Sequence, residues 1–273
     1  LPPLPAAFLD LYASTVRTST ADDPSLHQGR VRQIPHVAGN WPSHVYIEWY
    51  PPAAAHALLT SLLSDLQKRA GPSTQISTFL TSDLGVPLPL HISLSRPISL
   101  STAEKDGFLA QLVASISRGS VAPFELSCRG VEWHRTEESG RSFLVLRVQS
   151  SSNSNDDTNT TDKNPELTEL LRRCNLAAGS HGQPQLYQWA TTARDSSAGV
   201  ERESSKQPKS ANVWDAFHLS IAWSFAKPTE ELKQVTQAAF SENGGSAKRI
   251  CETKIPVEGV KVKIGNVVTH VPL

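Results

Sequence analysis

The sequence predicts a mixed α/β fold in which one order of strands and helices occurs twice along the chain. Two apolar runs, Leu90–Ser95 and Phe217–Ala222, each carry a histidine and a serine two positions apart. A strand and then a helix are predicted before each run, and a helix-start signal follows each histidine at the same distance. We therefore expect one domain over residues 1–273, with repeats near 44–134 and 141–272.

The first repeat begins with Val45–Trp49, which alternates apolar and polar residues as a half-buried strand does. The pair Pro51–Pro52 then opens an Ala- and Leu-rich helix that is expected to end near Gly71. After the first histidine strand, Ser101–Glu104 has the pattern of a capping box. A second helix is therefore expected to begin there.

The second repeat follows the same order. Phe143–Val148 is predicted to be a strand, and Asn164–Pro165 opens a helix that fades near Gly179. After the second histidine strand, Pro228–Glu231 is a further helix start. Both repeats therefore read as strand, helix, histidine strand, helix, strand.

Two polar stretches are predicted to be flexible insertions in the second repeat. Residues 150–163 are almost entirely Ser, Asn, Asp and Thr, and 191–210 are polar with mixed charge. Such segments bury too little apolar surface to order themselves.

Composition excludes several classes of protein. The 273 residues include 26 basic and 26 acidic side chains, so no bulk charge indicates nucleic-acid binding. An RNA partner is compatible with this neutrality, because a protein that engages only a strand end needs few phosphate contacts.

Cys128, Cys174 and Cys251 lack zinc spacing and are expected to be reduced thiols, as in the cytosol or nucleus. We expect no membrane span, no signal peptide at Leu1–Pro5, and a monomer.

The two histidine strands are the candidate catalytic elements. Side chains two positions apart share one face of a strand, so His91, Ser93 and Ser95 are expected to point one way, as are His218 and Ser220. A single histidine of this kind is commonly a hydrogen-bonded structural residue. His134-Arg135-Thr136 has similar spacing, but it runs into a turn and lacks the apolar alternation. Two copies in matched contexts favour a functional pair.

Two imidazoles and two hydroxyls suit proton transfer at a phosphate. Histidine has a reference pKa of about 6.5, so one ring can accept a proton from a ribose 2′-hydroxyl while the other donates one to the departing 5′-oxygen. Ser93 and Ser220 can donate hydrogen bonds to the non-bridging oxygens, where charge develops. This chemistry requires RNA or a related diol, and it requires no metal or other cofactor.

These motifs resemble the 2H phosphoesterase superfamily, and within it the family of phosphodiesterases that process the 3′ end of U6 small nuclear RNA. The similarity covers nearly the whole chain. It is carried by Leu4-Pro5, Phe8-Leu9-Asp10, Gly29–Arg32, Pro35-His36, Gly39–Trp41, His44–Ile47, His91–Ser95 and Phe217–Trp223.

The resemblance implies two pseudo-symmetric lobes, each an antiparallel sheet flanked by helices, with the active site in the cleft between them. It further implies a nuclear, metal-independent 3′-to-5′ exoribonuclease that trims an oligouridine tail and leaves a 2′,3′-cyclic phosphate or a 3′-phosphate. We assign His218 as general base and His91 as general acid, although the near-symmetry of the site makes these roles exchangeable.

The family has an aromatic residue upstream of the second motif that stacks on the terminal base. In this chain the corresponding position holds Asn212, and Trp214 is the natural substitute. Tyr187 is a weaker candidate for the same role. A buried Trp214 without any substrate contact is the competing interpretation.

Two other functions fit the same residues. One is a 2H enzyme that acts on 2′,3′-cyclic phosphates of other RNAs or small nucleotides. The other is a non-catalytic protein that binds RNA ends, although a pure binder does not need two titratable groups. A bell-shaped dependence of rate on pH is expected of the enzyme and not of the binder.

Overall fold

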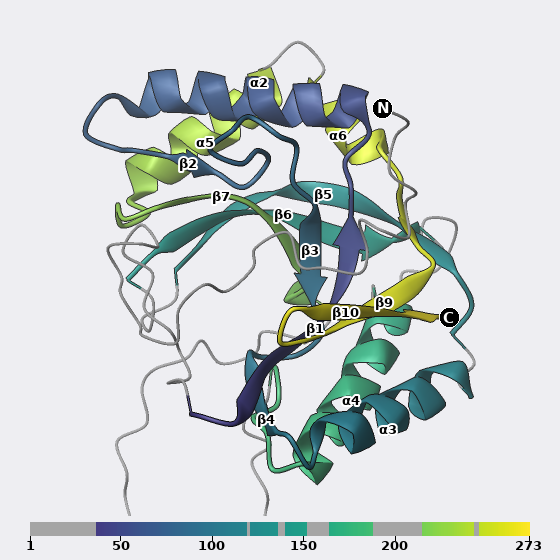
Figure 1. Ribbon diagram of the computed structural model, residues 1–273. Helices are drawn as coiled ribbons and strands as arrows, with labels where there is room; N and C mark the ends of the chain where they lie inside the picture. The colour runs from purple at the N-terminus through teal and green to yellow at the C-terminus, as the bar shows by residue number, and fades with distance from the viewer. Residues whose placement is uncertain (1–36, 119–120, 136–139, 152–163, 188–214, 243–245) are drawn as a thin grey trace, which may run out of the picture.

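The computed structural model describes residues 37–118, 121–135, 140–151, 164–187, 215–242 and 246–273. They form two antiparallel sheets with helices packed on them, which confirms the mixed α/β class (Figure 1). In chain order the elements are β1 (Asn40–Trp49), α2 (Ala53–Ala70), β2 (Ser77–Thr78), β3 (Leu90–Ser93), β4 (Ile98–Ser101), α3 (Lys105–Ser117), β5 (Phe124–Arg135), β6 (Ser142–Ser150), α4 (Pro165–Ser180), β7 (His218–Ser224), α5 (Glu230–Glu242), α6 (Ser246–Glu252), β8 (Ile255–Val257), β9 (Gly259–Ile264) and β10 (Val267–Pro272).

The first sheet has the strand order β10-β9-β1-β3, and β4 also pairs with β1. The long strand β1 pairs with β4 through Asn40–Ser43 and with β3 through Tyr46–Trp49. Val45, Ile47 and Trp49 alternate on its buried face, as the sequence pattern predicts. The second sheet has the order β2-β7-β6-β5-β8, with β6 at its centre.

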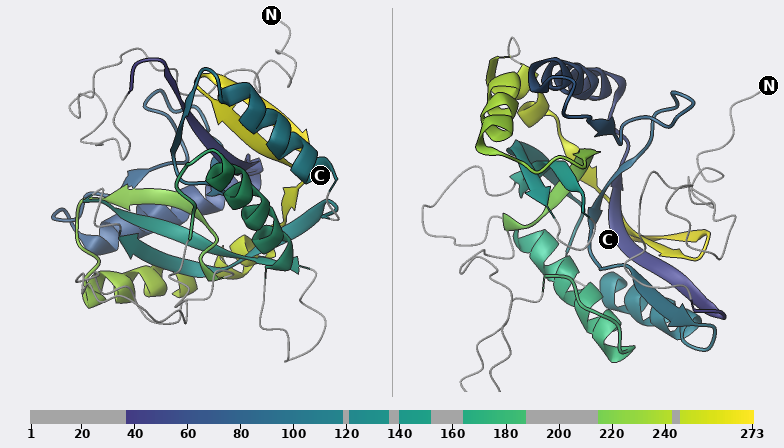
Figure 2. Two further views of the ribbon diagram at one scale, coloured as in Figure 1. Left: turned by 90° about the horizontal axis from the view of Figure 1, so that it is seen from below. Right: turned by 90° about the vertical axis from the view of Figure 1, so that its left-hand side faces the viewer.

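Each sheet contains two strands from the other half of the chain, β9 and β10 in the first sheet and β2 and β5 in the second. β5 leaves the first half to pair with β6, and β9 leaves the second half to pair with β1. The helices follow the same rule, because α2 packs against α5 and α6, while α3 packs against α4. Figures 1 and 2 show these two helical groups at opposite ends of the molecule. Neither half can therefore complete its own sheet, and an internal duplication stays a prediction.

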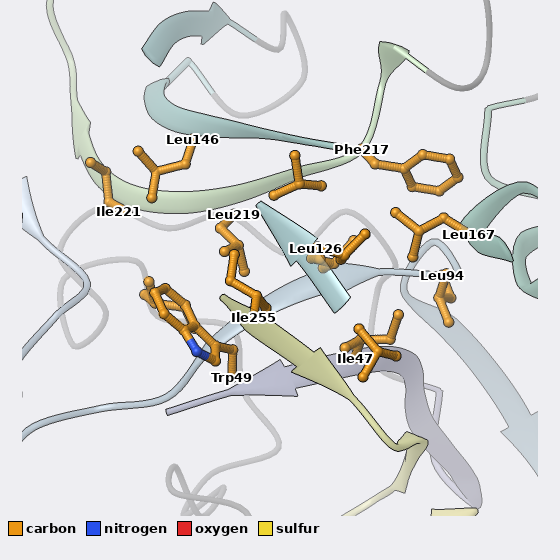
Figure 3. Packing of buried hydrophobic residues seen from close by; sticks show 14 of the residues in the cluster. Ile47, Trp49, Leu94, Leu126, Leu146, Leu167, Phe217, Leu219, Ile221 and Ile255 are labelled. Atoms are coloured by element: carbon orange, nitrogen blue, oxygen red, sulfur yellow. The ribbon is translucent and has the colours of Figure 1, made fainter. Parts of the chain in front are cut away.

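One cluster of buried hydrophobic residues joins the two sheets. In Figure 3, Ile47 and Trp49 of β1 lie opposite Leu219 and Ile221 of β7, with Ile255 of β8 beside them. The two halves of the chain thus share a single core. This packing brings the two histidine strands into contact, because β3 and β7 approach each other along the same core.

The predicted helix ends mostly agree with the structure. α2 follows Pro52 and stops at Gly71, whose φ of 75° lies in the left-handed region that glycine tolerates best. α4 begins with Pro165 in its first turn and ends one residue after Gly179. α5 begins after Thr229, whose hydroxyl accepts a hydrogen bond of 3.2 Å from the Leu232 N–H.

Half of the predicted capping box, the bond from the Glu104 carboxylate back to the Ser101 N–H, forms one turn ahead of the helix. The Glu104 carboxylate accepts hydrogen bonds from the Ser101 N–H at 3.1 Å and the Ser101 hydroxyl at 2.6 Å, and these bonds lower the pKa of Glu104. α3 nevertheless begins only at Lys105, because residues 102–104 form a turn first. The helix start predicted directly after Ser101 is therefore wrong by one turn.

Several predictions fall partly or wholly outside the described residues. Those on 191–210 and on the motifs before residue 37 cannot be placed, and only 150–151 of the first insertion is described. Cys128, Cys174 and Cys251 are free thiols, and the Cys128 thiol donates a weak hydrogen bond of 3.5 Å to the Gly130 carbonyl. Within the described part of the chain, no helix is both long and apolar enough to cross a membrane.

We expect Trp133→Phe to destabilise the packing of β5 on α5. The Trp133 indole N–H donates a buried hydrogen bond of 2.8 Å to the Thr236 hydroxyl. Removing the donor leaves a buried oxygen with one bond fewer and should lower the free energy of unfolding by about 1–3 kcal/mol, measured by urea denaturation. In the double variant with Thr236→Val, both partners are apolar and part of the loss should be recovered. An additive double variant would contradict this account.

Candidate functional site

The first histidine strand presents its polar residues on one face, as predicted. Leu90 and Ile92 of β3 are buried in the core, while His91 is exposed and Ser93 is partly exposed. His91 lies opposite Glu48 of β1 in the strand register, and Ser93 lies opposite Tyr46. The core-facing residues therefore fix the direction in which the candidate acid and hydroxyl donor point.

The second histidine strand repeats this arrangement. Leu219 of β7 is fully buried, whereas His218 and Ser220 are partly exposed on the other face. His218 lies opposite Arg147 of β6. The charge of His91 reaches His218 and contributes to lowering its pKa. The structure thus brings together the two predicted histidines from halves of the chain that are far apart in sequence.

Ser95 departs from the prediction that it shares the face of His91. β3 ends at Ser93, and Ser95 is only 2% exposed. Its hydroxyl accepts a hydrogen bond of 2.9 Å from the Val45 N–H and donates one of 2.7 Å to the Arg96 carbonyl. The chain bends after Ser93 and turns Ser95 into β1, so Ser95 holds two segments together.

His218 is held in a defined tautomer. Its Nδ1 lies 2.7 Å from the Ala216 carbonyl oxygen, which can only accept, so Nδ1 carries the proton. Nε2 of the neutral ring then has a lone pair available to accept a proton. Burial is the main cause that lowers the pKa of His218 to about 4, assisted by the charges of Arg147, His134 and His91 and opposed by the Ala216 bond. The free protein therefore holds His218 neutral at pH 7, the form that a general base needs.

His91 has two aromatic neighbours, His44 and Tyr46, to which the sequence assigned no place beside a histidine strand. The rings of His44 and Tyr46 stack with centroids 5.2 Å apart, and both meet the His91 ring edge-on, at 5.5 and 5.7 Å. Both side chains belong to the polar face of β1. The alternation of apolar and polar residues along β1 predicts that these two side chains face away from the core. It does not reveal which strand lies beside them.

His134 is a third histidine at the site, and the turn predicted after it lies mostly outside the described residues. It lies in β5, with Val131 and Trp133 alternating on the buried face, and its ring centroid is 5.9 Å from that of His218. Burial and then Arg147 lower the pKa of His134. The alternation of buried residues along 126–133 is the signal that could have identified this strand.

Arg147 and Tyr187 meet at the carbonyl that holds His218. Arg147 Nη1 lies 3.2 Å from the carbonyl oxygens of both Asp215 and Ala216, and its Nε lies 2.8 Å from Glu132. The Tyr187 hydroxyl donates a hydrogen bond of 3.2 Å to the same Ala216 carbonyl. No local sequence pattern distinguishes Arg147, because its partners are close only in the folded sheet.

The proposed base-stacking residues are only partly described. Tyr187 packs its ring edge-on against Phe217, with centroids 6.1 Å apart, and burial raises the pKa of its hydroxyl to about 12. These contacts make Tyr187 a support for the His218 strand, and stacking by this residue stays a prediction. Trp214 and Asn212 lie outside the described residues.

The site thus combines two imidazoles and two hydroxyls on the exposed faces of neighbouring strands. Such a set can take a proton from one oxygen of a phosphodiester, give a proton to another, and donate hydrogen bonds to the rest. Where the structure describes the chain, no group of three or more His, Cys, Asp or Glu side chains could hold a metal ion.

The chain is similar to known proteins along its whole length. The family model HVSL, described as an uncharacterised conserved protein, matches residues 2–272. The U6 snRNA phosphodiesterase 1 of Neurospora crassa is 44% identical over 100% of this chain and 74% of that protein. The proteins of the same name from Rattus norvegicus and Homo sapiens are 30% and 28% identical over 54% of this chain, and over 50% and 51% of their own lengths.

The fold resembles solved structures as well. The structure of Kluyveromyces marxianus Usb1 with uridine monophosphate matches with a TM-score of 0.58 and 12% identity, covering 85% of this chain and 98% of that chain. A second structure of that protein matches with a TM-score of 0.56. At this level of identity the similarity is one of fold.

The stability of the protein should depend on pH through His218. Its pKa is about 4 in the folded state, against 6.5 as the ordinary value. Between these values the unfolded chain binds more protons, so the free energy of unfolding should fall as the pH is lowered from 6.5 to 4. His218→Gln should weaken this slope in urea titrations at several pH values. His181→Gln, which removes an imidazole that contacts Gln111, is the control, and an unchanged slope in His218→Gln would contradict the account.

Proposed function

Since the chain belongs to the U6 snRNA phosphodiesterase 1 family, we propose that it is a metal-independent 3′-to-5′ exoribonuclease that shortens the oligouridine tail of U6 small nuclear RNA. The single observation that carries the mechanism is the neighbouring pair of His-x-Ser strands, with Nε2 of His218 in the proton-accepting form. Action on this RNA would place the protein in the nucleus.

The proposed reaction is a transesterification within the RNA. The 2′-hydroxyl of the penultimate nucleotide attacks the phosphorus that joins it to the terminal nucleotide, and its proton passes to Nε2 of His218. The bond from phosphorus to the 5′-oxygen breaks, and the His91 imidazolium gives a proton to that oxygen. Ser93 and Ser220 donate hydrogen bonds to the non-bridging oxygens. The shortened RNA then ends in a 2′,3′-cyclic phosphate.

The same groups can open the cyclic phosphate. Water attacks the phosphorus and gives a proton to His91, the bond from phosphorus to the 2′-oxygen breaks, and His218 gives a proton to that oxygen, which yields a 3′-phosphate. No cofactor takes part in either step of this proposal. The terminal base would stack on Trp214 or Tyr187, with Asn212 nearby, and the solved structure of Kluyveromyces marxianus Usb1 with uridine monophosphate supports recognition of a nucleotide. We propose that the protein works as a monomer on the RNA 3′ end.

Removing either histidine should abolish most of the activity. We expect His91→Ala and His218→Ala to lower kcat/KM by about 10²- to 10⁴-fold, since each removes one proton transfer. Ser93→Ala and Ser220→Ala should each lower kcat by about 10²-fold or more, since each removes a donor to the charge that develops. The assay is trimming of a uridine-tailed RNA, followed on gels. Wild-type trimming by His91→Ala or His218→Ala would sink the proposal, and His181→Ala is the control for general damage.

A modified substrate tests the function directly. The protein is incubated in EDTA with a short RNA ending in several uridines, and with the same RNA carrying a deoxyribose in the penultimate nucleotide. Stepwise shortening of the first substrate only is expected, because the second lacks the attacking 2′-hydroxyl. Mass spectrometry then identifies the product ends. Shortening of both substrates would exclude the proposed attack, and shortening of neither would favour small cyclic phosphates as substrates.

A further inference from the structure

We propose that Arg147 is a positioning residue of the site, which holds the backbone carbonyl that fixes the tautomer of His218 and places a positive charge beside this imidazole. The inference rests on the proposed role of His218 as general base. It adds a residue that acts on the reaction without touching the reacting atoms.

Arg147 is placed for this role by the strand register. It lies directly opposite His218 in the pairing of β6 with β7, on the face that also carries Ser220. Its Nη1 donates to the carbonyls of Asp215 and Ala216, the residues that precede β7, at 3.2 Å each. Ala216 is the residue whose carbonyl accepts the Nδ1 proton of His218 at 2.7 Å. Arg147 therefore fixes the acceptor that selects the tautomer.

The guanidinium is itself anchored. Its Nε forms an ion pair of 2.8 Å with Glu132 on β5, and the Arg147 side chain is only 17% exposed, against 56% for that of Glu132. A second arginine, Arg129, forms an ion pair with the side chain of Asp215. Arg129 lies at the β5 bulge, between Cys128 and Gly130 in the register. Two arginines from neighbouring strands thus hold the segment that leads into His218.

Charged and titratable groups from three strands act on His218. Arg147 on β6, His134 on β5 and His91 on β3 each lower the pKa of His218, and Glu132 partly neutralises Arg147. Tyr187, with a pKa raised to about 12, is neutral near pH 7 and acts through its hydrogen bond to Ala216. Arg147 supplies the permanent positive charge among these groups. Its loss should raise the pKa of His218 and let protonation compete with base catalysis at higher pH.

The two parts of this role can be separated by substitution. Arg147→Met removes both the charge and the donors, whereas Arg147→Lys keeps the charge but loses the planar fork that reaches both carbonyls and Glu132. Arg173→Met is a matched control. The Arg173 side chain is 13% exposed, forms an ion pair of 2.7 Å with Glu169 and donates a hydrogen bond to the Ser115 carbonyl. Like Arg147, it links a glutamate to a backbone carbonyl, but it does so between α4 and α3 and away from His218.

The experiment measures the pKa and the tautomer of the His218 imidazole by NMR. It also measures how kcat/KM on the uridine-tailed RNA depends on pH. In Arg147→Met we expect the pKa of His218 to rise, its Nδ1–H tautomer to become mixed, and the acidic limb of kcat/KM to move to higher pH. At pH 7 its kcat/KM should fall by about 10- to 100-fold, as when hydrogen-bond partners of metal-binding histidines are removed. Arg147→Lys should keep the pKa near that of the wild type with a smaller loss of kcat.

The outcomes separate this inference from the proposed function. If Arg147→Met only lowers the melting temperature, as Arg173→Met is expected to do, and leaves the pKa and tautomer of His218 unchanged, the positioning role is wrong. A rise in KM alone would make Arg147 a substrate contact and would also overturn it. The NMR readout requires no catalysis, so it tests Arg147 even if the RNA is not cleaved. An active His218→Ala would instead remove the proposed function on which the inference rests.

Discussion

The pairing of β5 with β6 and of β9 with β1 is the constraint on which the rest of this structure depends. Each pairing carries a strand from one half of the chain into the sheet of the other half, so the two sheets form around one shared core. The pairing of β5 with β6 also brings Glu132 and His134 beside Arg147 and His218. The surroundings of the candidate base therefore exist only when both halves are folded together.

The core determines where the site residues point. Along β7, Leu219 is buried and His218 and Ser220 lie on the opposite face, so a slip of one residue in register would bury the polar pair and expose the leucine. Burying one such side chain is worth roughly 1.5–3 kcal/mol, and β3 repeats the pattern with Leu90 and Ile92. The orientation of the site is thus a consequence of apolar packing rather than of attraction among its polar groups.

Burial and hydrogen bonding act in opposite directions on His218. Burial lowers its pKa, and the bond to Ala216 raises it by a smaller amount, so the ring is neutral but a weak base in the free protein. A bound phosphodiester would add negative charge beside the ring and raise this pKa towards the range in which general base catalysis is efficient. Under the proposed function, substrate binding would therefore increase the basicity of His218. The neighbouring cations would limit that rise and keep the ring unprotonated before attack.

The sequence by itself determined the class of the fold, the strands β1, β3, β6 and β7, most of the helix ends, and the four residues that carry the proposed chemistry. The predictions of strands and helix ends succeed because alternation along a strand and capping signals at a helix are local properties, whereas the roles of the four residues stay a prediction. Only the tertiary structure decided that the two sheets exchange strands, that Ser95 turns away after β3, and that His134 and Arg147 lie beside His218. These features depend on which strands pair and in what register. That choice is made by the shared core, through contacts between residues that are distant in the chain and leave no local pattern.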